Sequence, residues 1–268
     1  MTDSILRVEH LMMHFGGIKA LNDVNLEVER GSITALIGPN GAGKTTVFNC
    51  LTGFYRATGG SIVLRAREKV TDVIQVLGQK LHPDDFLHPA QLGRRIYYKM
   101  FGGTHLVNRA GLARTFQNIR LFNSMTVLEN VMVGLDRASR YSLLEAALHI
   151  GRYFPAERAA KAKAMAILED IGIAHFAHMQ ATNLSYGNQR KVEIARALAT
   201  APKLLLLDEP AAGMNPKETE DLAELIFRMR HDYQLSVLLI EHDMPFVNRL
   251  CERVMVLEYG KPLFSGLM

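Results

Sequence analysis

The chain has 268 residues, a formal net charge of +4 and two cysteines. Its length suits one large α/β domain, alone or with a subdomain. The mild basic excess forms no cluster of the kind found in nucleic-acid-binding arms, so it fits a phosphate ligand or an anionic membrane surface better than a nucleic acid. Cys50 and Cys251 have neither metal-ligand nor disulfide spacing, which indicates a reducing compartment.

Signals for a membrane span or a histidine metal site are missing from the sequence. No apolar run approaches the roughly 18 residues of a membrane span, and the first residues lack the pattern of a signal peptide. Any membrane association is therefore expected to come through a partner. Four histidines in two pairs have no cysteine or carboxylate at ligand spacing, and they predict no metal site: His82, His88, His175 and His178.

The first part of the chain combines alternating and continuous apolar patterns. Residues 5–9 and 24–28 alternate, which predicts antiparallel strands with one face in water. Residues 32–37 fit a continuous apolar strand that leads into a glycine loop. Residues 44–51 then fit a helix that is closed by Gly53.

The next segment is less regular. Gly59 and Gly60 predict a turn before a strand at 61–64. Apolar residues at helical spacing follow, and two prolines interrupt them: Val70, Val73, Ile74 and Leu77, then Pro83 and Pro89. A second short helix is predicted around Leu92 and Ile96. Its other side carries three basic residues, which we interpret as a solvated face: Arg94, Arg95 and Lys99.

The second half of the chain changes from helices to an alternation of strands and helices. Helical patterns occupy residues 128–133, 143–149 and 156–171. Strands are then predicted at 204–207, 236–240 and 253–258, with helices at 217–231 and 244–250 between them. This rhythm is typical of βαβ units and implies a parallel sheet.

We therefore predict a single α/β domain with a mainly parallel core sheet and an antiparallel β edge. Its core comprises residues 1–114 and 202–268, and a helical subdomain, residues 115–201, is inserted between these two parts. Residues 65–110 are predicted to form an atypical insertion, to which the sequence assigns no function.

Residues 38–45 read Gly-Pro-Asn-Gly-Ala-Gly-Lys-Thr, which is a G-x-x-x-x-G-K-[ST] phosphate-binding loop between a strand and a helix. Its glycines let backbone N–H groups converge on phosphate oxygens, and the helix adds its positive end. The lysine neutralises the β- and γ-phosphates and the first threonine reaches Mg²⁺. The predicted ATP-binding residues are Gly38, Pro39, Asn40, Gly41, Ala42, Gly43, Lys44, Thr45 and Thr46.

A second chemical signal follows the four leucines at 204–207, which predict a strand buried on both faces. This strand delivers Asp208 and Glu209 to its C-terminal end, where ligands bind in open α/β sheets. Asp208 is placed to hold Mg²⁺ through water. Glu209 is placed to polarise a water molecule for attack on the γ-phosphorus.

Five elements in this order resemble the nucleotide-binding subunits of ABC transporters, which are P-loop NTPases. They are the loop 38–45, Gln117, the stretch Leu-Ser-Tyr-Gly-Asn-Gln-Arg at 184–190, the pair Asp208-Glu209, and His242 after a strand. The resemblance covers nearly the whole chain. It implies an ATPase of the ABC type that uses ATP and Mg²⁺.

The resemblance also implies roles for residues outside the loop. Gln117 contacts Mg²⁺ and the attacking water, and His242 contacts the γ-phosphate. Ser185 and Gly187 reach the γ-phosphate of an ATP that the opposite subunit binds, through a hydroxyl and a backbone amide at a helix start. Phe15 lies where the family places an aromatic ring against adenine, although a core position explains this residue nearly as well.

The residues around Gln117 narrow the resemblance to one group of these ATPases. Residues 114–122, Arg-Thr-Phe-Gln-Asn-Ile-Arg-Leu-Phe, and residues 240–244, Ile-Glu-His-Asp-Met, resemble importer ATPases for branched-chain and other hydrophobic amino acids. The stretch 184–188 departs from the usual Leu-Ser-Gly-Gly-Gln but keeps Ser185 and Gly187. Asn215 stands where most of these ATPases have an aspartate, and residues 65–110 match the family poorly.

The resemblance implies a bacterial importer on the cytoplasmic face of the inner membrane. Its parts would be a second ATPase subunit, identical or paralogous, two permease subunits and, indirectly, a periplasmic binding protein. Residues 118–133 are expected to receive a permease helix. Importers of urea or amides and the lipopolysaccharide exporter remain alternatives. So does a soluble ABC ATPase of DNA repair or translation, which would predict a duplicated cassette, a long coiled coil or a basic arm.

Overall fold

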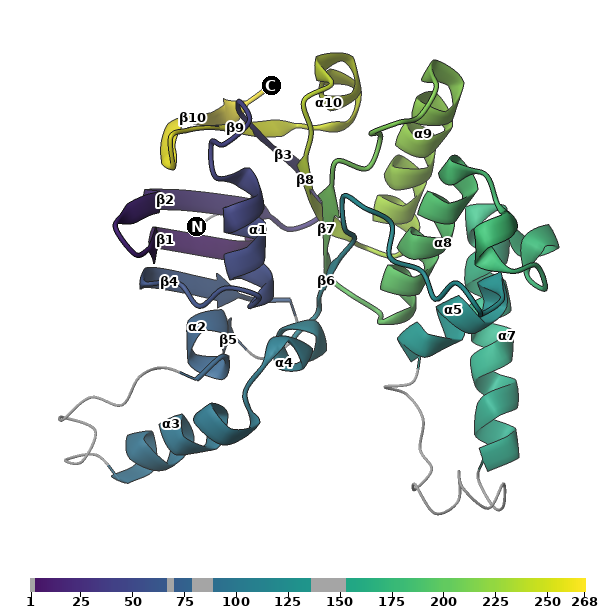
Figure 1. Ribbon diagram of the computed structural model, residues 1–268, viewed down its shortest axis with the longest axis horizontal. Coiled ribbons are helices and arrows are strands. Elements are labelled where there is room, and N and C mark those ends of the chain that lie inside the picture. Colours follow the sequence, from purple (N-terminus) through teal and green to yellow (C-terminus); the bar gives the residue numbers. More distant parts are fainter. Residues whose placement is uncertain (1–2, 67–69, 79–88, 136–152) are drawn as a thin grey trace.

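A computed structural model of the protein describes residues 3–66, 70–78, 89–135 and 153–268. Figure 1 shows a small sheet and helix α1 on one side of a larger sheet, and most of the long helices on its other side. Within the described segments, no helix is long and apolar enough to span a membrane.

The small sheet has the strand order β2-β1-β4-β5 and is antiparallel. Its longest pair, β1 (Ser4–Phe15) and β2 (Ile18–Glu29), confirms the strands expected from the alternating pattern and extends them. β4 (Gly59–Leu64) begins at the two glycines, so the predicted turn there was wrong. Gly60 has a φ of +97°, and a Cβ on it would lie 2.4 Å from the His10 carbonyl oxygen, which explains why glycine stands inside this strand.

The larger sheet has the strand order β10-β9-β3-β8-β7-β6. Five strands are parallel: β3 (Ile33–Ile37), β6 (Leu112–Arg114), β7 (Leu204–Asp208), β8 (Ser236–Ile240) and β9 (Arg253–Glu258). β10 (Lys261–Leu267) pairs antiparallel with β9 at one edge. The predicted α/β fold with a mainly parallel sheet is therefore confirmed.

Helices cover both faces of this sheet. α1 (Lys44–Thr52) follows β3 and ends at Gly53, as expected. α9 (Pro216–Asp232) and α10 (Met244–Leu250) connect the last parallel strands. The helical segment contains α5 (Val127–Leu135), α7 (Tyr153–Ile171) and α8 (Tyr186–Ala199), with two 3₁₀ turns, Ala174–Phe176 and Ala181–Asn183. The subdomain boundaries at 114/115 and 201/202 stay predictions, and the predicted helix at 143–149 lies outside the described residues.

The segment before β6 differs from its sequence pattern. Thr71–Asp72 is strand β5, and only Val73–Val76 is helical (α2). α3 (Pro89–Phe101) begins at a proline that was expected to break a helix; at the first helical position proline costs no hydrogen bond. α4 (Thr104–Arg109) then leads into β6.

The sheet separates two apolar cores. Leu205 and Leu207 of β7 belong to a core with α5, α7, α8, α9 and α10. Leu204 and Leu206, which point to the opposite face, belong to a core with α1 and the small sheet. Burial on both faces explains the four consecutive leucines and fixes the carboxyl end of β7 between the two cores.

Candidate functional site

The phosphate loop lies between β3 and α1, and its glycines are required by close backbone contacts. Gly38 has a φ of +151°, and a Cβ on it would lie 2.1 Å from the Leu257 carbonyl oxygen. Gly43 has a φ of +102°, and a Cβ there would lie 3.0 Å from the Ala20 carbonyl oxygen. The loop is therefore held against β2 and β9 in a shape that other residues would disturb.

Lys44 is the buried cation of this loop. Its Nζ donates to the carbonyl oxygens of Gly38 at 2.6 Å and Pro39 at 2.9 Å. Burial lowers the pKa of the lysine, whereas the charges of Glu209 and Asp208 raise it in part. The ammonium group thus stands within electrostatic reach of both carboxylates at the end of β7.

Asp208 is buried at the end of β7 and pairs with an arginine of β6. The Arg114 guanidinium donates to Asp208 Oδ2 at 2.7 Å and to Asn49 Oδ1 of α1 at 2.6 Å. It also lies over the rings of Phe48 and Phe116, at 5.5 and 5.2 Å from their centroids. This arginine fixes the orientation of Asp208 by a charge-assisted hydrogen bond.

Glu209 leaves the strand in a left-handed conformation, with a φ of +45°. Its backbone N–H donates to the Ile240 carbonyl oxygen at 3.0 Å. The Gln117 side chain donates from Nε2 to Glu209 Oε2 at 2.7 Å. The structure therefore brings together two residues that are 92 positions apart in the sequence and that were both predicted for the site.

His242 follows β8 and has a side chain that is 67% exposed. Its neighbour Glu241 is buried and accepts two hydrogen bonds, from the Ala211 N–H at 2.9 Å and the His242 N–H at 3.1 Å. Burial raises the pKa of Glu241, and these backbone donors oppose that shift. Glu241 ties the loop after Glu209 to the loop that carries His242.

Ser185 and Gly187 lie at the start of α8, apart from the phosphate loop; Figure 1 places α1 and α8 on opposite sides of β7. Ser185 is the N-cap residue and accepts from the Asn188 N–H at 3.4 Å. Gly187 is buried, and a Cβ on it would lie 3.1 Å from Glu218 Oε1. Ser185 itself is exposed, so its hydroxyl is presented outward with the first turn of the helix.

A buried ion pair joins α8 to the segment that carries Gln117. The Arg190 guanidinium donates to Glu193 Oε2 and to the main-chain oxygens of Phe116 and Gln117. Glu193 Oε1 accepts in return from the Phe116 N–H at 3.1 Å. Burial raises the pKa of Glu193, although Arg190 opposes this shift. The main chain at Gln117 is thus held to α8.

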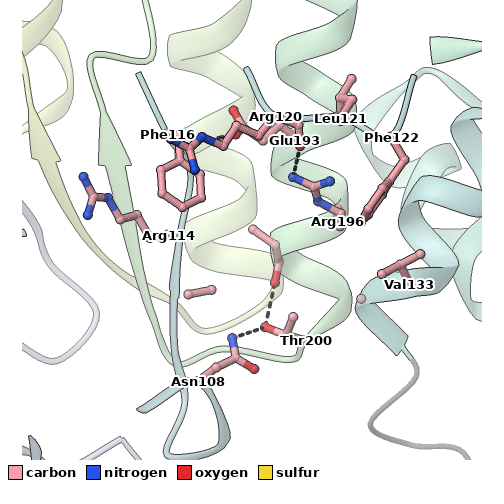
Figure 2. A pocket seen from close by; sticks show the side chains of 13 residues that line it. Asn108, Arg114, Phe116, Arg120, Leu121, Phe122, Val133, Glu193, Arg196 and Thr200 are labelled. Atoms are coloured by element: carbon pink, nitrogen blue, oxygen red, sulfur yellow. Dashed lines mark hydrogen bonds between the residues drawn. The ribbon is translucent and has the colours of Figure 1, made fainter. Parts of the chain in front are cut away.

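An open groove of about 510 Å³ lies beside this segment. Figure 2 shows Arg120, Phe122 and Val133 around it, with Arg196 between them. The Arg196 guanidinium donates to the Arg120 carbonyl oxygen and lies over the Phe122 ring, 5.6 Å from its centroid. The predicted permease contact at 118–133 therefore supplies part of a groove between β6, α5 and α8.

Two other predicted residues have simple surroundings. Phe15 is partly exposed at the end of β1, and its ring meets Tyr55 edge to face at 5.1 Å. Thr45 is an exposed residue at the start of α1. Their predicted contacts with adenine and Mg²⁺ stay predictions.

Sequence reasoning missed the residues that position the predicted ones: Arg114, Arg190, Glu193 and Glu241. One of them carried a usable signal, because Glu241 directly follows the apolar run 237–240. Such charges are buried only with partners, but the partners lie too far away in the sequence to be recognised from it.

A glycine loop after one parallel strand, and a carboxylate pair after another, define a nucleotide-binding α/β protein of the P-loop class. Residues 21–212 match the family described as ABC transporter. The chain belongs to this family, whose cassettes couple ATP hydrolysis to transport. The predicted ABC type of the fold is therefore confirmed.

Individual relatives agree with this assignment. The chain is 43% identical to the high-affinity branched-chain amino acid transport ATP-binding protein LivG of Salmonella typhimurium, over 99% of this chain and 92% of the relative. BraF of Pseudomonas aeruginosa, with the same description, gives the same values. The ADP conformation of MJ1267, an ATP-binding cassette of an ABC transporter, aligns with a TM-score of 0.74 and 30% identity, over 100% of this chain and 92% of that one.

Proposed function

We propose that the chain is the ATP-hydrolysing subunit of a bacterial importer for branched-chain and other hydrophobic amino acids. The 2.7 Å hydrogen bond between Gln117 and Glu209 is the main support for the mechanism, because it joins the neighbour of the groove residue Phe116 to a carboxylate near Lys44. The relatives LivG and BraF support the cargo, since their descriptions name branched-chain amino acids.

The loop residues would bind the triphosphate. Backbone N–H groups of residues 40–43 and of the start of α1 would surround the phosphates, and Lys44 would move from its loop carbonyls to the β- and γ-oxygens. Glu209 accepts a proton from the water that attacks the γ-phosphorus. Gln117, already hydrogen-bonded to Glu209, orients that water.

The oxygen atoms of Thr45, Asp208 and Gln117 would hold Mg²⁺. Hydroxyl, carboxylate and amide oxygens are hard donors that suit this cation, and Arg114 already orients the buried Asp208 carboxylate. A Mg²⁺ ion held by these residues would offset negative charge on the triphosphate.

A second ATPase subunit would complete each site. The exposed residue Ser185 and the N–H groups at the start of α8 would bind a phosphate of an ATP held by the second subunit. His242, with its exposed side chain, would contact the γ-phosphate.

The groove around Arg120, Phe122 and Val133 would receive a cytoplasmic helix of a permease subunit. Two permeases and a periplasmic binding protein then complete the importer, and the ATPase works at the cytoplasmic face of the inner membrane. Because Arg190 and Glu193 hold Gln117 to α8, a shift in the groove reaches Glu209 through Gln117.

Vanadate trapping in native membranes tests this function. With ATP and vanadate, the tagged chain should be recovered with two permeases and an ATPase partner; Lys44→Ala is the matched control, because it removes phosphate binding. Recovery with ribosomes or DNA would contradict a transport role.

Uptake of labelled leucine should fall in cells that lack the gene, while uptake of labelled urea should not. Loss of urea uptake or of lipopolysaccharide export instead would reassign the cargo to one of the alternatives.

A further inference from the structure

Helix α3 (Pro89–Phe101) has a composition unlike that of the core helices. Its sequence, Pro-Ala-Gln-Leu-Gly-Arg-Arg-Ile-Tyr-Tyr-Lys-Met-Phe, holds three basic residues and no acidic residue. At 1.5 Å per residue, its 13 residues span roughly 20 Å. A basic amphipathic helix of this kind is typical of contact with an anionic surface.

The apolar face of α3 is exposed. Ile96, Tyr97, Met100 and Phe101 are 43%, 55%, 70% and 57% exposed. At about 100° per residue they fall within an arc of roughly 140° on one side of the helix. Four large apolar side chains in six positions form a continuous exposed patch, which in a folded protein marks an interaction surface. The sequence pattern had predicted a solvated face only for the three basic residues and had made no prediction for this apolar side.

The other side of α3 is fixed to the body of the protein. Tyr98 packs against the core that contains the small sheet. Gly102 donates its N–H to the Tyr98 carbonyl oxygen at 2.8 Å, and a Cβ on Gly102 would lie 2.5 Å from the Val76 carbonyl oxygen of α2. The end of α3 therefore packs closely against the backbone of α2. This contact fixes the orientation of the exposed apolar arc relative to the rest of the protein.

The position of α3 relates it to the groove. α4 begins three residues after the end of α3, and Asn108 of α4 lines the groove beside Thr200 (Figure 2). Figure 1 shows α3 extending outward from α4, away from both sheets. The groove that we assign to the permease is thus lined in part by α4, the helix that directly follows α3 in the chain.

Charge decides which occupant suits this arc. A helix with three cations and no anion complements a negatively charged surface. Two aromatic rings and a methionine, with Lys99 beside them on the helix, are the side chains expected at the boundary between headgroups and acyl chains. This combination favours a lipid surface over a protein groove.

We propose that α3 binds the anionic headgroup surface of a membrane, with Ile96, Tyr97, Met100 and Phe101 inserted at the headgroup boundary and Lys99 facing lipid phosphates. The helix would hold this subunit at the bilayer directly, in addition to its contact with a permease. This contact goes beyond the proposed function and does not depend on the cargo.

Vesicle flotation of the full chain tests the proposal. The protein should float with vesicles of phosphatidylglycerol and phosphatidylethanolamine, and much less with phosphatidylcholine vesicles. The double variant Tyr97→Ser/Met100→Ser should weaken this binding about tenfold or more, and Lys99→Glu about tenfold. Phe227→Ser, which changes a residue of α9 that is 56% exposed, is the matched control and should bind as the unchanged chain does.

Fluorescence gives a second readout, because the chain contains no tryptophan. Tyr97→Trp should show a blue shift of its emission on addition of anionic vesicles, and quenching by brominated lipids. Phe227→Trp should show neither effect. The ATPase activity and the melting temperature of all variants should match the unchanged chain, because α3 lies outside the nucleotide site.

Three results would overturn the proposal. One is a full chain that does not float with anionic vesicles. Another is equal loss of binding in the α3 variants and in Phe227→Ser. The third combines two observations: the emission of Tyr97→Trp does not shift, and Tyr97→Ser/Met100→Ser no longer co-purifies with the permease. This result would assign the helix to a protein partner.

Discussion

The two ends of the nucleotide site differ in how much of their surroundings the chain itself supplies. One side of the loop 38–45 packs against β2 and β9, and we call this the enclosed end of the site; its lysine already has two carbonyl partners. The start of α8 instead presents Ser185 to solvent, with its main contacts directed back to the helix. The first end lies within one chain, whereas in the proposed dimer the second would be completed by another chain. The comparison predicts different consequences for changes at each end.

The largest effect is expected from Glu209→Gln, which removes the proton acceptor but keeps the shape of the site. Turnover should fall roughly 10²–10⁴-fold, while ATP binding remains. If α8 of another subunit closes the site, a dimer should then accumulate with ATP. Steady-state ATPase assays and size-exclusion chromatography with ATP measure both effects; turnover near that of the unchanged chain would refute the role of Glu209.

Gly38→Ala should damage the enclosed end. The added Cβ would lie 2.1 Å from the Leu257 carbonyl oxygen, so the loop must shift. Strain of this kind costs about 1–3 kcal/mol, and ATP affinity should fall by up to roughly a hundredfold. Gly172→Ala is the matched control, because Gly172 follows α7 outside the loop and also has a positive φ, but its Cβ would meet no atom within 4 Å. Equal affinities for both variants, by titration calorimetry, would contradict the enclosure of the loop.

Ser185→Ala should leave the enclosed end intact. The single chain should bind ATP as before, because the hydroxyl belongs to the outward-facing end. Loss of a hydrogen bond to a charged phosphate costs about 1.5 kcal/mol or more, so turnover should fall roughly tenfold. A part of this loss comes from removal of the helix cap. Ser185→Asp keeps a capping side chain but repels phosphate, so it separates the effect of the cap from the effect of the phosphate contact. Reduced ATP affinity of the single chain would break the distinction between the ends.

The smallest effect concerns the pH dependence of stability at Glu241. Because burial raises the pKa of this carboxyl, its contribution to stability is full below its unfolded pKa of about 4.3 and is lost as pH rises through the raised value. As the pH rises from about 5 to about 8, the unfolding free energy of Glu241→Gln should therefore increase relative to that of the unchanged chain. Urea unfolding at both pH values measures this, with Glu258→Gln as an exposed control; a constant difference would contradict the assignment.

The parts of the site that could be predicted from the sequence are those that local chemistry determines. The loop 38–45 and the strand before Asp208 are recognisable because backbone geometry and burial restrict each position. The pair of Arg114 and Asp208 could not be predicted, because it depends on β6, which has three residues and no readable period. The helix α3 was predicted, but its exposed apolar side was not, since a helical pattern does not say which face remains exposed.

The ion pair of Arg190 and Glu193 has a consequence for timing. Gln117 has its side chain on Glu209 of its own chain, and its main chain on the helix that begins at Ser185. In the proposed dimer that helix serves the other nucleotide. Any displacement of Gln117 during one hydrolysis event therefore moves a phosphate donor of the neighbouring site. Two sites joined in this way would not hydrolyse ATP independently. The state of one site would determine when hydrolysis can occur at the other.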